Sequence, residues 1–226
     1  MRNSRMRVAF VTVFTFISFF TFSCSKTDSL SIADQYGQFN SIYLNSQIAT
    51  LPMQTISDDE AKSLIHMREE EKLARDVYIT MFNKYGLMIF DNISRSEQTH
   101  TDAILQLLTK YNINDPVGVN AIGVFTDPGL QALYTNLVNA GNVSILEAYK
   151  VGATIEDLDL YDLKVDLLKV DNQDIILVYQ MLSKGSRNHM RNYFSSLKSL
   201  GFTYVPQFIT QSDLDAIVNS AMERGF

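Results

Sequence analysis

The chain has 226 residues and a formal net charge of −6, with 46% hydrophobic and 19% charged residues. This composition supports a packed globular domain, and the acidic balance argues against nucleic acid as the main partner, because phosphate contacts need clustered Lys and Arg. Only 4 Pro and 10 Gly are present, and long stretches lack both, which favours helices over a strand-and-turn architecture.

Residues 1–24 are typical of a secretion signal. A basic start, MRNSRMR, precedes an uncharged apolar run over residues 8–22, which is short for a membrane span of about 20 residues and suits a signal peptide. The only cysteine, Cys24, follows at once, as at a bacterial lipoprotein processing site, although Phe22 is larger than is usual there. We therefore expect Cys24 to carry a lipid anchor that holds the protein to a membrane of the bacterial cell envelope, outside the cytoplasm. Plain secretion and an uncleaved anchor are the alternatives.

The next segment, residues 25–56, is rich in Ser, Gln, Asn and Thr, and we interpret it as a tether that contains a short helix. The folded domain is expected over 57–204, followed by a C-terminal extension, 205–226, with a short terminal helix. Ser57 and Glu60 have the spacing of a capping box, which predicts a helix start. Apolar residues at steps of three and four then indicate one helix face that ends at Gly86 and includes Glu71. The nearby charges Glu69, Glu70 and Lys72 are interpreted as solvated, and His66 as a surface residue.

The second predicted helix begins near Asp91, and its apolar face is interrupted by Glu97 and His100. A long connection follows, with a short helix over 127–140. The third helix is predicted over 144–168, with Glu156 and Asp159 near its inner face, and the fourth over 171–200, with Ser186 and His189. Four long helices joined by a long connection after the second predict an all-α, ferritin-like four-helix bundle with up-down-down-up topology.

Each apolar face is broken by a residue of a metal-binding type, and this feature points to a shared site. Burying a lone carboxylate costs roughly several kcal/mol. Polar residues that interrupt the apolar face near the middle of all four helices therefore indicate that their side chains meet in one site. A metal ion would offset the carboxylate charge and use the imidazoles as neutral ligands. Glu97 and His100 are three residues apart and therefore share one helix face.

Two motifs carry a resemblance to a known family. EEEKLARDVY is similar to the first-helix Glu-x-x-Ala-Arg-x-x-Tyr pattern of rubrerythrin-type ferritin-like proteins, at Glu71, Ala74, Arg75 and Tyr78, and EQTH matches their second-helix Glu-x-x-His. Over about residues 60–200 the chain also resembles an uncharacterised bacterial ferritin-like family, a domain of unknown function. This resemblance implies a di-iron carboxylate centre in a four-helix bundle.

The fourth helix departs from the di-iron pattern, because Ser186 stands where a second Glu-x-x-His would have its Glu. Asp159, three residues after Glu156, is expected to compensate. The predicted metal ligands are Glu71, Glu97, His100, Glu156, Asp159 and His189. Two iron ions are expected, with manganese or zinc as alternatives. Because Ser186 replaces a carboxylate ligand, a single ion or an asymmetric pair of ions remains an alternative.

Three functions are compatible with this site. The first is an extracytoplasmic oxidase, ferroxidase or peroxidase that uses O2 or peroxide, and for which the absence of Cys-x-x-Cys pairs implies an external electron donor. The second is a metal-binding or sensing module without turnover, and the third is a helical interaction protein without metal. A tethered monomer or homodimer suits a lipid anchor better than a storage cage does.

Overall fold

The structure is a computed structural model, and it describes residues 34–224. All regular elements in this part of the chain are helices, which confirms the all-α prediction. They are α1 (Ser41–Thr50), α2 (Asp58–Tyr85), α3 (Met88–Lys110), α4 (Pro128–Gly141), α5 (Ile145–Asp166), α6 (Gln173–Ser199) and α7 (Gln211–Val218). The expected signal segment and Cys24 lie outside the described residues. Among the helices described, none has the length and apolar character needed to cross a bilayer.

The helix ends follow from local chemistry. At the start of α2, the Ser57 hydroxyl accepts a hydrogen bond from the Glu60 amide (3.2 Å), and the Glu60 carboxylate accepts one from the Ser57 amide (2.9 Å), which is the predicted capping box. The helix ends where Gly86 adopts φ +67°, a left-handed conformation that favours glycine. At α4 the Asp127 carboxylate caps the first turn. The second long helix, α3, begins at Met88, three residues before the predicted start.

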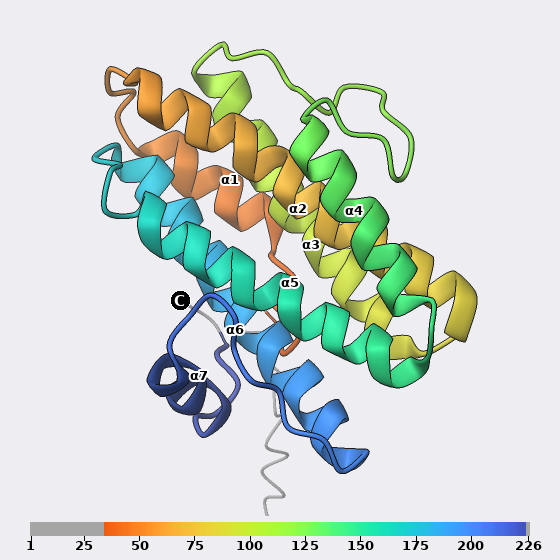
Figure 1. Cartoon of the computed structure of the whole chain (residues 1–226). Coiled ribbons are helices and arrows are strands. Elements are labelled where there is room, and N and C mark those ends of the chain that lie inside the picture. The colour runs from red at the N-terminus through yellow and green to blue at the C-terminus, as the bar shows by residue number, and fades with distance from the viewer. Residues whose placement is uncertain (1–33, 225–226) are drawn as a thin grey trace, which may run out of the picture.

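The chain direction follows from the connections. The turn Gly86–Leu87 joins α2 to α3 as antiparallel neighbours, and α5 and α6 form a second packed pair. In the chain, α4 lies between these two pairs, and it packs along α2 and ends beside the C-terminal end of α2. There the Tyr85 hydroxyl of α2 donates to the carbonyl of Gly141, the last residue of α4 (2.8 Å). The helix α5 therefore begins at the same end as α3, and these two helices run in the same direction (Figure 1). The short helix α7 packs against α6.

A polar layer divides the apolar core into two clusters. On α2, Met67 belongs to one cluster and Leu73 to the other; on α6, Leu182 and Met190 are separated in the same way. On α3, the boundary between the two clusters lies between Ile93 and Ala103. On α5, it lies between Leu160 and Leu163. The predicted ligands lie at or beside these breaks, so the helices are held together by apolar packing on both sides of the layer.

Part of the predicted tether belongs to the folded domain. The helix α1 packs on α3, with Leu44 and Ile48 buried, and the amide of Phe39 donates to the Thr99 hydroxyl (3.0 Å). The segment 34–51 therefore packs directly against the long helices, instead of acting only as a spacer.

The prediction that Glu69, Glu70 and Lys72 are solvated is wrong, since all three are buried. The connection before α4 covers this side of α2, and the Glu69 carboxylate accepts hydrogen bonds from the amides of Thr126 and Asp127. Lys72 pairs with Asp76 and donates to two carbonyl groups of the same connection. His66, expected at the surface, is half-buried.

The segment after α7 is held to α6 by an ion pair that makes a testable contribution. Glu223 accepts hydrogen bonds from Arg187 (2.7 Å) and Arg191 (2.8 Å). Burial alone would raise the pKa of Glu223, but these two arginines lower it from 4.5 to about 2. A group with a lowered pKa stabilises the fold above its unfolded pKa, and this stabilisation is lost as pH falls toward the folded pKa.

We therefore expect Glu223→Gln to lower the free energy of unfolding at pH 7 by about 1–2 kcal/mol, after allowance for partial exposure. The difference from the wild type should shrink as pH falls from about 4.5 toward 2. Urea unfolding of both proteins at several pH values measures this difference in the free energy of unfolding. A difference that does not change with pH would contradict the ion pairing of Glu223 with the two arginines.

Candidate metal centre

All six predicted ligands are buried in the polar layer. Glu71 comes from α2, Glu97 and His100 from α3, Glu156 and Asp159 from α5, and His189 from α6, and none is more than 6% exposed. Each of the four long helices therefore contributes at least one of these side chains.

Five of the six form two groups of three that share Glu97. In the first group, the Nδ1 atom of His100 lies 2.8 Å from Glu97 Oε2 and 3.2 Å from Glu71 Oε2. In the second, the Nδ1 atom of His189 lies 2.9 Å from Glu97 Oε1 and 3.2 Å from Glu156 Oε2. Within each group, one ligand atom from every residue lies within 4.8 Å of the others. Glu97 therefore offers one oxygen to each group, and it would be a ligand shared by both groups if each held a metal ion.

The backbone next to α1 fixes the proton positions on both histidines. The Nε2 atom of His100 is 3.1 Å from the carbonyl oxygen of Gly37, and that of His189 contacts the carbonyl of Tyr36. A carbonyl oxygen can only accept, so each Nε2 carries the hydrogen. Each Nδ1 atom then faces the carboxylates and, in the neutral ring, presents a lone pair to them. The Phe39 ring stacks on His100 with centroids 4.5 Å apart.

These backbone contacts were not predicted from the sequence. The side chains of Tyr36 and Phe39 are ordinary for a connecting segment, and a carbonyl group has no sequence signature. Gly37 is the single signal: its φ of +77° favours glycine, and a Cβ there would lie 2.6 Å from the Cα of Gly185. Close approach of the segment to α6 thus requires small residues on both sides.

Without metal, the histidines are the cations of the site. Burial alone would lower the pKa of His100, but the charges of Glu97 and Glu71 raise it to about 10. Burial alone would also lower the pKa of His189, but the charges of Glu97 and Glu156 raise it well above its ordinary value. Both rings are then imidazolium ions whose Nδ1 hydrogens donate to the carboxylates.

The carboxylates differ in their proton affinity. For Glu97, burial would raise the pKa, but the charges of His189 and His100 outweigh it and lower the pKa. Burial, followed by the charge of Asp159, raises the pKa of Glu71 well above its usual value. Burial and the charge of Glu156 raise the pKa of Asp159 to about 8. The metal-free site therefore retains protons that a bound cation would displace.

Asp159 belongs to neither group of three. The hydroxyl of Ser186 donates to Asp159 Oδ2, while Oδ1 is buried without a hydrogen-bond partner among the described residues. The serine that replaces the expected Glu thus contacts the carboxylate on the neighbouring helix. Asp159 remains a predicted ligand at the edge of the site.

The donor set fits a pair of divalent metal ions. The Oε1 atom of Glu71 is buried with no hydrogen-bond partner in the described part of the chain, which is costly for a carboxylate oxygen unless a cation lies beside it. Imidazole nitrogen together with carboxylate oxygen suits iron, manganese and zinc. Tyr78 donates to the Glu156 carboxylate, and such a contact orients a ligand.

Comparison with known proteins places the chain in a family. Residues 60–221 match the family model described as "Uncharacterized protein domain (DUF2202)". The chain is similar to the uncharacterised protein MJ0754 of Methanocaldococcus jannaschii, with 54% identity over 178 residues, which are 79% of this chain and 96% of that protein. The family therefore extends beyond the bacteria in which we expected it.

A solved structure agrees with this assignment. The crystal structure of hypothetical protein MJ0754 from Methanococcus jannaschii matches with a TM-score of 0.76 and 53% identity, covering 77% of this chain and 99% of that one. Fold and sequence therefore agree over most of the chain, which belongs to the family of the uncharacterised domain DUF2202.

Proposed function

We propose that this chain is a ferritin-like four-helix-bundle protein that holds two divalent metal ions, iron before manganese or zinc, and oxidises its substrate with O2 or peroxide. The observation that carries the proposal is the position of Glu97, which has one carboxylate oxygen 2.8 Å from the Nδ1 of His100 and the other 2.9 Å from the Nδ1 of His189. The expected location outside the cytoplasm, on a lipid anchor, is part of the proposal and rests on residues 1–24 alone.

Charge supports two ions over one. Glu71, Glu97, Glu156 and Asp159 carry four negative charges when all are ionised, and the histidines are neutral as ligands. Two divalent cations balance this charge, whereas one would leave two uncompensated charges among groups that are at most 6% exposed. Uncompensated buried charge is strongly unfavourable.

Bound iron would supply a redox pair able to react with O2 or peroxide. The chain's own residues would do the remaining work. Burial in the polar layer excludes bulk water, the carbonyls of Tyr36 and Gly37 hold the histidines with Nδ1 inward, and Tyr78 orients the Glu156 carboxylate.

Elemental analysis of the full-length chain tests the proposal most directly. We expect about two iron or manganese ions per chain to remain in the buried centre after dialysis, and oxidation of added Fe(II) under air or peroxide. A chain that binds no metal after anaerobic addition of Fe(II) would overturn it.

A second candidate is a metal-binding or sensing module without turnover. The contact between Ser186 and Asp159 favours it, because a serine in place of a carboxylate leaves the His189 side with one fewer acidic ligand. Bound metal with no oxidation of Fe(II) would select this candidate over the first.

Tyr78→Phe should weaken metal binding without unfolding the protein. The change removes the hydrogen bond to Glu156 but retains the aromatic ring, whose centroid lies 5.4 Å from that of the Tyr193 ring. Loss of a contact that orients a ligand costs about 10–100-fold in metal affinity. Tyr85→Phe removes a hydrogen bond to Gly141 remote from the site, and is the matched control. Equal affinity of both variants, measured by competition with a chelator, would contradict the role of Tyr78.

A further inference from the structure

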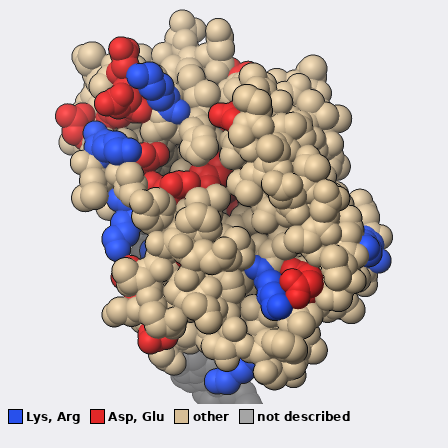
Figure 2. All heavy atoms as spheres, viewed as in Figure 1, with Lys and Arg blue, Asp and Glu red and all other residues tan. Residues whose placement is uncertain are grey.

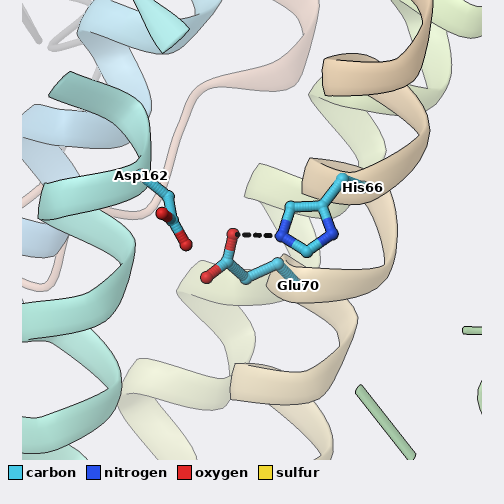
Figure 3. Close-up of side chains that lie close together, drawn as sticks. All are labelled: His66, Glu70 and Asp162. Carbon is cyan, nitrogen blue, oxygen red and sulfur yellow. Dashed lines mark ion pairs between the residues drawn. The ribbon is translucent and has the colours of Figure 1, made fainter. Parts of the chain in front are cut away.

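A third group of metal-binding side chains lies outside the buried centre. His66 and Glu70 of α2 face Asp162 of α5, and one ligand atom from each lies within 4.8 Å of the others (Figure 3). The Nε2 atom of His66 is 3.6 Å from Glu70 Oε2, which is too far for a hydrogen bond. The carboxylate of Glu70 points into the space between the imidazole and Asp162 (Figure 3).

Glu70 is the unexplained member of this group. Its residue is 4% exposed, and its Oε2 atom has no hydrogen-bond partner among the residues described. The neighbouring Glu69 is equally buried, but both of its oxygens accept hydrogen bonds from backbone amides. A buried carboxylate oxygen without a hydrogen-bond donor is costly, and the His66 imidazole lies 3.6 Å from this one. A cation bound between the two side chains would therefore stabilise Glu70, whereas Glu69 does not need one.

One member of the group, His66, is accessible from solution. His66 lies at the edge of a surface hollow of about 360 Å³ that is also lined by Asp59, Lys62, Ser63, Asp166, Lys169 and Val170. The two lysines pair with Asp59 (3.7 Å) and Asp166 (3.3 Å). Acidic side chains gather in a hollow between α2 and α5 (Figure 2). A cation can therefore reach His66 without opening the bundle.

We propose that His66, Glu70 and Asp162 form a third site, separate from the buried centre, that binds one divalent transition-metal ion from solution. One neutral imidazole and two carboxylates offset a double positive charge, and the mixed nitrogen and oxygen donors favour Fe(II), Co(II), Mn(II) or Zn(II) over magnesium. Since His66 is half-buried, water completes the coordination and the ion exchanges with solvent.

The third site is close in the fold to the buried centre. Glu70 directly precedes Glu71, and Asp162 follows Asp159 by one helical turn. The third site therefore lies next to the buried ligands, on the side of the centre that faces α2 and α5. Its existence does not depend on the redox function proposed above.

Cobalt titration of the full-length chain tests the site. Equilibrium dialysis with Co(II) should give one fewer ion per chain for His66→Ala and for Asp162→Asn than for the wild type, or at least about 10-fold weaker binding of that ion. Asp59→Asn, at the rim of the same hollow, is the matched control and should bind as the wild type does. Unchanged binding by both His66→Ala and Asp162→Asn would overturn the proposal.

The same titration in a Glu97→Ala background separates this site from the centre. There we expect about one Co(II) per chain, lost when His66→Ala is added, and an anomalous diffraction peak between His66 and Glu70 in crystals soaked with cobalt. Absence of both the ion and the peak would overturn the third site, whatever the wild type binds. A chain whose only cobalt is lost with His66→Ala would instead retain the third site and refute the centre.

Discussion

Glu97→Ala is expected to reduce the metal content of the buried centre from about two ions per chain to near zero, which leaves only the ion of the third site. Because Glu97 presents one oxygen to the His100 group and one to the His189 group, its removal takes a ligand from both positions at once. Glu71→Gln should affect only the His100 side and leave about one ion in the buried centre. The two variants together distinguish a shared ligand from two independent sites, with binding weakened by about 100-fold or more where a direct ligand is lost.

The control for these variants is Glu69→Gln. Glu69 is as buried as Glu97, but it contacts the backbone of Thr126 and Asp127 and not the centre. It should retain full metal content even if its stability falls. Helix content by circular dichroism should remain close to that of the wild type in Glu97→Ala, because apolar clusters hold the helices on both sides of the polar layer. If Glu97→Ala still bound two ions that the further change His66→Ala did not remove, the assignment of Glu97 as a ligand shared by both groups would be wrong.

Sequence reasoning located the polar layer because helix periodicity converts spacing into direction. On α3, Glu97 and His100 interrupt an apolar face whose other members, such as Ile93 and Ile104, are fully buried, so the same face had to be buried at the polar positions. His189 followed from the same logic on α6. Capping chemistry at Ser57 and Gly86 fixed the ends of α2 because both signals act within one turn.

The errors come from contacts between segments far apart in the chain. Glu69 and Lys72 appear solvated in a single helix, and they are buried because the connection before α4 folds over them. The carbonyls of Tyr36 and Gly37 reach the histidines across more than 60 residues of sequence. Backbone carbonyl groups are present at every residue, so the glycine at position 37 is the one sequence signal for these two contacts.

Gly185→Ala should disrupt the centre although residue 185 carries no ligand. An alanine in place of glycine within a helix is normally stabilising by about 1 kcal/mol. Here the added Cβ would contact the His100 ring, 2.5 Å from Nε2, and this ring is fixed by Glu97 on one side and Gly37 on the other. Overpacking costs about 1–3 kcal/mol, so we expect a net loss of stability of about 1 kcal/mol and displacement of His100.

The measurement is metal affinity alongside urea unfolding. Displacement of His100 should weaken binding at its own side of the centre by about 10-fold or more and leave the His189 side less affected. Gln180→Ala, at an exposed position of the same helix, controls for helix propensity and should change neither quantity by much. A more stable Gly185→Ala protein with unchanged metal affinity would mean that α6 and the His100 ring are farther apart than described. Because Gly37 approaches Gly185 from the other side, the same result would also remove the reason for glycine at both positions.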